Sequence, residues 1–201
     1  SMEDMIAEEE VVLTITHQGY IKRTALNTYR TQRRGGRGVQ GAMSKEEDFV
    51  EHLFIANTHN YMLFFTDQGK CYWLKVYDIP QGGRAARGRA IVNLIGCDPG
   101  EKIEAFVSVK EFDDNHYIAM ATRNGIVKKT VLSAYGKPRK GGIYAIEIRD
   151  GDKLIEARVT NGEYDILLGT SEGKSIRFSE GDIRASGRKT MGVKGITLGS
   201  K

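Results

Sequence analysis

The chain has 201 residues, 40% of them hydrophobic and 28% charged, which is ordinary for a folded, soluble protein. No apolar run approaches the roughly 20 residues of a membrane span, and no basic region followed by an apolar one opens the chain, so we expect a cytoplasmic protein. The formal net charge of +4 hides a strong local separation of charge.

The chain starts with an acidic segment. Residues 1–10 include Glu3, Asp4 and three consecutive glutamates at 8–10, with no Lys or Arg. A short run of like charge is usually solvated. We therefore expect residues 1–10 to be a lead-in or linker and residues 11–198 to form the folded domain.

Short apolar or β-branched runs follow, bounded by turn residues, and convincing helical periodicity is absent. Turns at Gly19, Gly69, Gly125 and Gly173 separate pairs of these runs, as in β-hairpins whose turn needs a positive φ. The pattern predicts an all-β fold with strands at residues 11–15, 20–23, 53–56, 62–66, 71–76, 91–95, 103–109, 117–122, 126–130, 143–148, 154–159, 166–169 and 175–178.

The hairpin turns recur at a regular spacing. Their glycines are 50, 56 and 48 residues apart, a period typical of propeller-like or solenoid arrays. Each repeat supplies about four strands, which predicts one four-stranded blade per repeat. We place the repeats at residues 11–56, 57–109, 110–159 and 160–192, with the start of a fifth at residues 193–198.

About fifteen residues after each turn comes a loop rich in arginine, lysine and glycine. The four basic loops, residues 30–41, 79–90, 135–142 and 183–195, hold 14 Lys or Arg and no Asp or Glu, whereas the rest of the chain holds 16 bases and 26 acids. This separation predicts a basic surface on an acidic scaffold, as expected for a polyanion partner. The loop cations are Arg30, Arg33, Arg34, Arg37, Arg84, Arg87, Arg89, Lys137, Arg139, Lys140, Arg184, Arg188, Lys189 and Lys194.

Seven consecutive residues of the first loop match a known motif. Gln32, Arg33, Arg34, Gly35, Gly36, Arg37 and Gly38 fit the pattern QRRGG[KR]G, which is called the A-box. The chain thereby resembles the C-terminal domain of the bacterial DNA gyrase A subunit, and the likeness extends through segments such as 17–22, 86–94 and 127–132. The resemblance implies a β-pinwheel, a propeller relative whose neighbouring blades exchange strands. About four of an expected six blades are present.

The resemblance also implies a function. Gyrase C-terminal domains bend duplex DNA around a basic rim, which supports ATP-dependent negative supercoiling by the holoenzyme. The A-box and the other loop cations would then bind DNA, and the chain would hold no catalytic residue and no cofactor, because ATP and Mg²⁺ are used on other domains. The implied partners are duplex DNA, and the gyrase A N-terminal region with the gyrase B subunit in an A2B2 holoenzyme on the bacterial chromosome.

The chemistry of the loops agrees with this role. An arginine fork donates two hydrogen bonds to a phosphate, and an adjacent glycine permits close backbone approach. No helix-turn-helix, zinc finger or basic zipper is found, so we expect backbone contacts rather than base reading. Basic residues on the expected strands either face solvent or contact DNA; they are Lys22, Arg23, Lys128, Lys129, Lys174 and Arg177.

Other classes of function are kept as alternatives. The C-terminal domain of the topoisomerase IV A subunit shares the blade fold but generally lacks an intact A-box, and a propeller that binds proteins needs no DNA contact. An enzyme has the least support, because no nucleophile–base set recurs in the loops. No metal site is expected from the scattered histidines or the two cysteines, which are His17, His52, His59, His116, Cys71 and Cys97.

Overall fold

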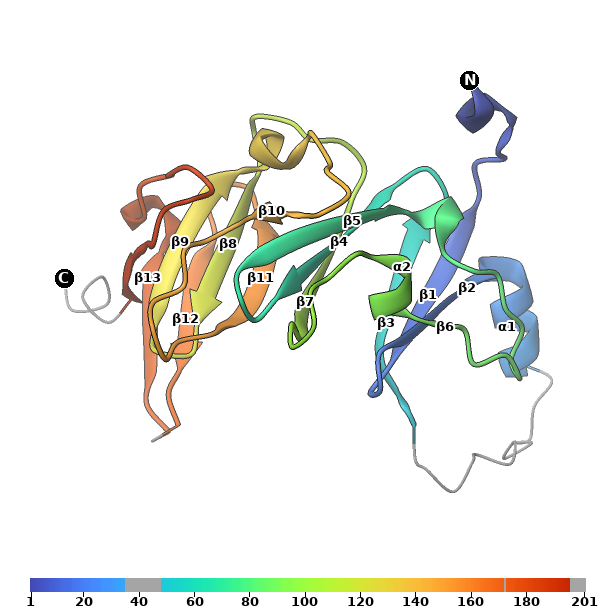
Figure 1. Ribbon diagram of the computed structural model, residues 1–201, viewed down its shortest axis with the longest axis horizontal. Coiled ribbons are helices and arrows are strands. Elements are labelled where there is room, and N and C mark those ends of the chain that lie inside the picture. Colours follow the sequence, from blue (N-terminus) through green and yellow to red (C-terminus); the bar gives the residue numbers. More distant parts are fainter. Residues whose placement is uncertain (35–47, 172, 196–201) are drawn as a thin grey trace. The chain divides into compact units, whose positions relative to one another are not determined.

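The computed structural model describes residues 1–34, 48–171 and 173–195. The described residues form two compact units. The first contains Ser1–Met62, Leu74–Gly96 and Ser108–Lys110, and the second contains Leu63–Trp73, Cys97–Val107 and the residues from Glu111 onward. Both units are built from antiparallel sheets, so the all-β prediction is confirmed. Figure 1 shows these sheets, with the ribbon coloured along the sequence from blue to red.

The first sheet, in the first unit, has the strand order β3-β1-β2-β6. β1 (Glu10–Thr16) and β2 (Tyr20–Ala25) form a hairpin, and the turn glycine, Gly19, has a φ of 83°, as its position predicted. β3 (Val50–Asn57) pairs with the other edge of β1. Residues 11–15 of β1 are all buried, because this strand is central and covered on both faces.

The same arrangement recurs in the next two sheets, whose orders are β10-β5-β4-β7 and β11-β8-β9-β14. Within the described residues, the last hairpin is a two-stranded sheet of β12 and β13. Positive φ at Gly69, Gly125 and Gly173 confirms the other predicted turns. The strands are β4 (Tyr61–Thr66), β5 (Lys70–Lys75), β7 (Ile103–Val109), β8 (Tyr117–Thr122), β9 (Ile126–Val131), β10 (Ile143–Tyr144), β11 (Leu154–Thr160), β12 (Asp165–Gly169), β13 (Ser175–Ser179) and β14 (Val193–Lys194).

The fourth strand of each four-stranded sheet comes from beyond the next hairpin in the chain. β6 (Arg89–Ala90) lies beyond the β4–β5 hairpin in the chain yet pairs with β2, and in the same way β10 pairs with β5 and β14 with β9. The residue after each exchanged strand donates its N–H to the carbonyl of a turn glycine. These bonds are Ile91 to Gly19 (2.9 Å), Ala145 to Gly69 (2.7 Å) and Gly195 to Gly125 (2.8 Å). Exchange of strands between repeats confirms the pinwheel fold.

Two α-helices replace expected loop or strand. α1 (Leu26–Arg34) continues directly from β2, so residues 30–34 are helical rather than part of a loop. Basic residues in its last turn favour the helix because they interact with its negative end. α2 (Ile91–Leu94) stands where a strand was predicted at 91–95, since Ile91 is buried while Val92 is 52% exposed.

The predicted strand at residues 143–148 is also shorter than expected. Only Ile143–Tyr144 pairs, as β10, although Ala145 and Ile146 are completely buried beyond it. Burial rather than pairing therefore explains the apolar run. Four 3-10 helices complete the elements, and they are η1 (Met2–Met5), η2 (Val76–Asp78), η3 (Leu132–Tyr135) and η4 (Glu180–Asp182).

The acidic lead-in is exposed over most of its length, as expected, but it is also anchored. Thr58, in the turn between β3 and β4, donates its N–H to the Glu9 carbonyl (3.0 Å), and its hydroxyl accepts from the Glu9 N–H (3.2 Å) and donates to the Ala7 carbonyl (2.8 Å). The Lys75 ammonium pairs with the Glu3 carboxylate at 2.9 Å. The lead-in is therefore attached to the first unit by specific contacts, which the sequence did not indicate.

The glycine before the exchanged strand β6 is required by the backbone. Gly88 has a φ of 86°, and a Cβ placed on it would lie 2.3 Å from the Ile21 carbonyl oxygen of β2. Gly192 precedes β14 in the same conformation, and a Cβ there would lie 2.5 Å from the Val127 carbonyl oxygen. Both positions combine a left-handed φ with contact between two backbones, which excludes any side chain.

We predict that Gly88→Ala lowers the free energy of unfolding by about 1–3 kcal/mol, because the new Cβ strains the backbone and displaces β6 from β2. Chemical denaturation of the variant measures this loss. The matched control is Gly83→Ala in the same loop, where φ is not positive and no atom lies within 4 Å of the new Cβ. Equal stability of the two variants would contradict the prediction.

Candidate nucleic-acid interface

The loop cations face solvent. Of the fourteen predicted DNA-binding cations, Arg37 lies outside the described residues; twelve of the other thirteen are exposed, and Arg188 is half-buried. Long cationic side chains at the surface keep their charge and are accessible to a polyanion. The structure therefore leaves these side chains available to bind phosphate.

None of these thirteen cations forms an ion pair with a carboxylate among the described residues. The paired Lys and Arg side chains in the same part of the chain lie outside the basic loops. They are Lys70, Lys75, Lys102, Lys129, Lys153, Arg158 and Arg177. Ion pairs with carboxylates thus occur on the scaffold, whereas the described loop cations make none within the described ranges.

The A-box is only partly described. Gln32, Arg33 and Arg34 occupy the last turn of α1, where Gln32 is half-buried and both arginines are exposed. Gly35, Gly36, Arg37 and Gly38 lie outside the described residues. The arginine positions therefore depend on a helix, which the loop interpretation had not anticipated.

The second loop is attached to β2 along its length. The Gly82 N–H donates to the Arg23 carbonyl (3.0 Å), the Thr24 hydroxyl donates to the Gly82 carbonyl (2.8 Å), and β6 pairs at the far end. The Arg87 guanidinium lies 3.9 Å from the centre of the Tyr20 ring and donates to the Gln18 side chain at 2.7 Å. An arginine held on an aromatic face loses less freedom when it binds an anion.

The third and fourth loops are ordered by internal turns. In the third, the Gly142 N–H donates to the Arg139 carbonyl at 2.9 Å. In the fourth, the hydroxyls of Ser186 and Thr190 are 2.8 Å apart. The Arg188 guanidinium donates to the Tyr144 carbonyl at 3.2 Å, which explains why this cation is less exposed than the others.

The strand cations differ from the loop cations. Lys128 and Lys129 on β9 are buried, and Lys22 and Arg23 on β2 are half-buried. All four donate to backbone carbonyls, for example the Lys22 ammonium to Gly83 (2.9 Å) and Ala86 (2.8 Å). The expectation that basic strand residues face solvent is therefore wrong for these four side chains, whereas Lys174 and Arg177 are exposed, the latter paired with Asp165. The four cations that donate to carbonyls lie three and four residues after the turn glycines Gly19 and Gly125, and this repeated spacing could have distinguished them from the loop cations in the sequence.

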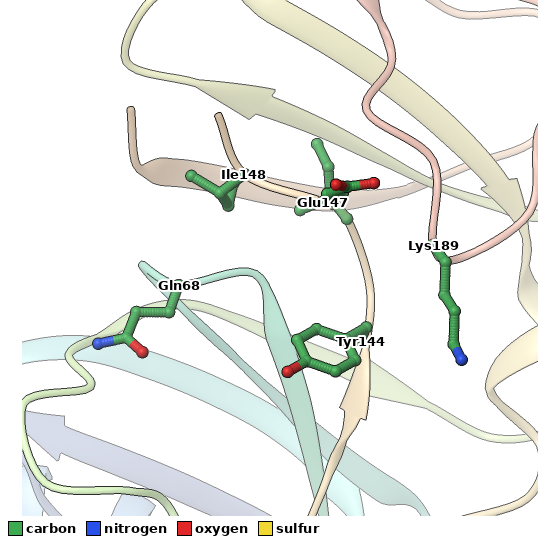
Figure 2. Close-up of a pocket in the computed structure, with 6 residues that line it drawn as sticks. Gln68, Tyr144, Glu147, Ile148 and Lys189 are labelled. Carbon is green, nitrogen blue, oxygen red and sulfur yellow. The ribbon is translucent and has the colours of Figure 1, made fainter. Parts of the chain in front are cut away.

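A pocket lies beside the second hairpin turn, in the second unit. Figure 2 shows Gln68 of the turn, Tyr144 at the end of β10, Ile148 beyond it, and Lys189 of the fourth loop, with Glu147 on the same wall as Ile148. Ile146 completes the lining. Lys189, a predicted DNA-binding residue, thus lines this pocket. The lining contains no nucleophile paired with a base, so the pocket does not resemble a catalytic site.

Metal and thiol chemistry find no support in the described part of the chain. No group of three or more His, Cys, Asp or Glu side chains there is placed to hold a metal ion. Cys71 is buried, which raises the pKa of its thiol well above the usual value, and Cys97 is half-buried. Both are unoxidised, and a thiol that stays protonated is a poor nucleophile.

A search of the described residues for a helix long and apolar enough to cross a membrane finds none.

Comparisons with known proteins agree with the fold. The sequence profile of the family described as "DNA gyrase C-terminal domain, beta-propeller" matches residues 10–57, 60–110, 116–161 and 164–201. The DNA gyrase A subunit of Clostridium acetobutylicum is 53% identical over 96% of this chain, and that of Escherichia coli is 47% identical over 99%. The chain spans 23% of the length of each of these relatives.

Solved structures show the same architecture. The C-terminal domain of a DNA topoisomerase IV superposes with a TM-score of 0.79 and 30% identity, covering 94% of this chain and 58% of that one. A DNA gyrase A C-terminal domain superposes with a TM-score of 0.68 and 23% identity, covering 92% of this chain and 60% of that one. The second likeness supports the fold alone.

We predict that stability rises with pH above neutrality because of Lys128. Burial lowers the pKa of its ammonium to about 7, whereas an unfolded lysine keeps its proton to about pH 10.5. Between these values the unfolded chain binds more protons, so the free energy of unfolding rises with pH by up to about 1.4 kcal/mol per pH unit. The neutral amine still has two N–H groups for its two carbonyl partners, Ala145 and Arg188.

Urea denaturation from pH 6.5 to pH 9.5 measures this slope. In Lys128→Met the contribution is absent, so the difference between the two proteins should grow as the pH rises. The same pH dependence in both proteins would contradict the prediction.

Proposed function

The chain belongs to the DNA gyrase C-terminal domain family, and on that premise we propose that it binds duplex DNA without sequence specificity and wraps it. The observation that carries this proposal is the set of exposed loop cations without carboxylate partners among the described residues. A dense set of unpaired cations attracts phosphates by releasing the counterions that surround DNA.

The mode of binding follows from the elements that carry the cations. Within the described residues, the basic side chains come from α1, from irregular loops and from two-residue strands, with no recognition helix for the major groove. Such groups contact phosphates and leave the bases unread, so preference between sequences comes from DNA bendability. The A-box residues Gln32, Arg33, Arg34, Gly35, Gly36, Arg37 and Gly38 are assigned to this contact, together with the other loop cations.

For the whole protein we propose the role of a gyrase A subunit. The chain would present wrapped DNA to the rest of an A2B2 holoenzyme, formed with the gyrase A N-terminal region and the gyrase B subunit. That holoenzyme uses ATP and Mg²⁺ on other domains to introduce negative supercoils, and it acts on the bacterial chromosome in the cytoplasm. The identity of 53% to a gyrase A subunit over 96% of the chain supports this role.

A second candidate is the C-terminal domain of the topoisomerase IV A subunit, favoured by the TM-score of 0.79 to a solved topoisomerase IV domain. The identity to that domain is 30%, well below the 53% and 47% found for gyrase A subunits, and the intact A-box also favours gyrase. A protein-binding propeller is the third candidate, and it requires no affinity for DNA.

We predict a steep dependence of DNA affinity on salt. If about ten of the loop cations meet phosphates, log K should fall against log salt with a slope near −9, because each contact releases counterions. Titration of fluorescent duplex DNA from about 50 to about 300 mM KCl measures the slope. No binding at the lowest salt concentration would favour the protein-binding propeller instead.

We also predict that changing Arg33, Arg34 and Arg37 together to Ala weakens DNA bending far more than folding. The two described arginines are exposed and make no ion pair with the described residues, so their loss should cost the scaffold little. Ligation of relaxed circles in the presence of wild-type and variant protein measures wrapping, and thermal unfolding measures folding. An unchanged DNA bend in the variant would overturn the assignment of the A-box.

A further inference from the structure

Two adjacent positions on the second strand of each of the first three hairpins contact the repeat that follows. They lie three and four residues after the turn glycines Gly19, Gly69 and Gly125. We call them the third and fourth positions. The third is Lys22, Tyr72 or Lys128, and the fourth is Arg23, Trp73 or Lys129.

At the fourth position, three different side chains make the same contact. Each donates a hydrogen bond to a carbonyl of the next 3-10 helix: Arg23 to Tyr77 of η2 (3.3 Å), Trp73 to Tyr135 of η3 (3.1 Å) and Lys129 to Glu180 of η4 (3.0 Å). Arg23 also donates to the Ile79 carbonyl at 2.6 Å. Because the tryptophan is neutral, the shared property is an N–H donor aimed at backbone and not a positive charge.

At the third position, the side chain lies against the glycine that precedes the exchanged strand. A Cβ placed on Gly88 would be 3.1 Å from the Lys22 Cβ, and one on Gly192 would be 3.1 Å from the Lys128 Cβ. In the second repeat, Tyr72 occupies the third position, and a Cβ placed on Gly142 would lie 2.7 Å from its ring. The third position therefore packs against the end of the basic loop in three repeats.

The two lysines at the third position add hydrogen bonds to the loop itself. Lys22 donates to Gly83 (2.9 Å) and Ala86 (2.8 Å), and Lys128 donates to Arg188 (2.6 Å). Both ammonium groups are thus directed at backbone carbonyls, and removal from water lowers the pKa of Lys22. An amine that is already desolvated and bonded to carbonyls has little to gain from a phosphate.

We propose that Lys22, Arg23, Lys128 and Lys129 are positioning residues, which hold the basic loop of the following repeat in place and do not themselves bind DNA. Lys22 and Arg23 hold the second loop, residues 79–90, and Lys128 and Lys129 hold the fourth, residues 183–195. The effect on DNA rests on the proposed function. The attachment of the loops does not rest on the proposed function, so the attachment and the effect on DNA binding are tested in separate experiments.

The first test measures the loop without DNA. Lys22→Met keeps the aliphatic stem but removes the donors, Lys22→Arg restores them, and Lys110→Met, an exposed lysine of the same unit, is the control of equal charge. Hydrogen exchange followed by mass spectrometry should show roughly tenfold or more faster exchange in residues 79–90 for Lys22→Met, with β1, β2 and β3 unchanged and with recovery in Lys22→Arg. Unchanged exchange in the loop, or an equal loss of protection throughout the sheet, overturns the proposal.

The second test is a double-mutant cycle on DNA binding. Lys22→Met should weaken binding when the second loop is intact. It should have no further effect once Arg84, Arg87 and Arg89 are changed to Gln, because the loop then has no cation left to position. An equal loss in both backgrounds would identify Lys22 as a phosphate ligand and overturn the proposal. If the wild-type protein binds no DNA, the proposed function fails, while the exchange experiment still decides the role of Lys22.

Discussion

The exchange of strands between repeats is the constraint on which the rest of the structure depends. The second strand of each of the first three hairpins, β2, β5 or β9, has an edge that is paired by a strand from beyond the next hairpin in the chain. An unpaired edge exposes a row of backbone donors and acceptors and invites association with other chains. Only two residues, such as Arg89 and Ala90, pair with each edge. The hydrogen bond to the turn glycine and the contacts of the third and fourth positions extend this short attachment over the whole loop.

This attachment assigns the basic residues of the chain to two environments. Lys22, Arg23, Lys128 and Lys129 of β2 and β9 are buried or half-buried and directed at carbonyls, whereas the described cations of the basic loops, all exposed except the half-buried Arg188, lack carboxylate partners within the described ranges. The first group holds backbone in place, and the second keeps its charge for a ligand. A count of Lys and Arg along the sequence cannot separate them, since Lys22 and Lys137 are equivalent by charge. Burial and hydrogen-bond geometry separate them.

The hairpins were predictable from the sequence because a glycine with positive φ between two β-branched runs has few alternatives. Strand exchange was implied by the resemblance, and β10 lies within the strand predicted at 143–148. β6 and β14 and the pairing partners of all three strands were not predicted, because a two-residue strand has no period and its partner lies in another repeat. α2 was taken for a strand because Ile91 and Val92 are β-branched, yet the buried residues of this segment, Ile91 and Ile95, are four residues apart, which is the spacing of one helix face. α1 was missed since its polar residues offer one buried side chain, Leu26, and no apolar stripe. The charge separation predicted exposed loop cations, and twelve of the thirteen described ones are exposed, although the positions of Arg30, Arg33 and Arg34 on a helix were not predicted.

The structure gives a different reason for some of the loop glycines than the sequence suggested. At Gly88 and Gly192 the reason for glycine is internal, because their Cβ atoms would collide with carbonyls of the neighbouring strand. Close approach of backbone to phosphate is therefore not needed to explain them, whereas at Gly83, where a Cβ would meet nothing within 4 Å, the structure gives no internal reason for glycine. A loop that is fixed at both ends by its own sheet loses little conformational entropy when DNA binds. The arginines between the fixed points thus act from a set backbone, which suits a partner recognised by the spacing of its phosphates rather than by its bases.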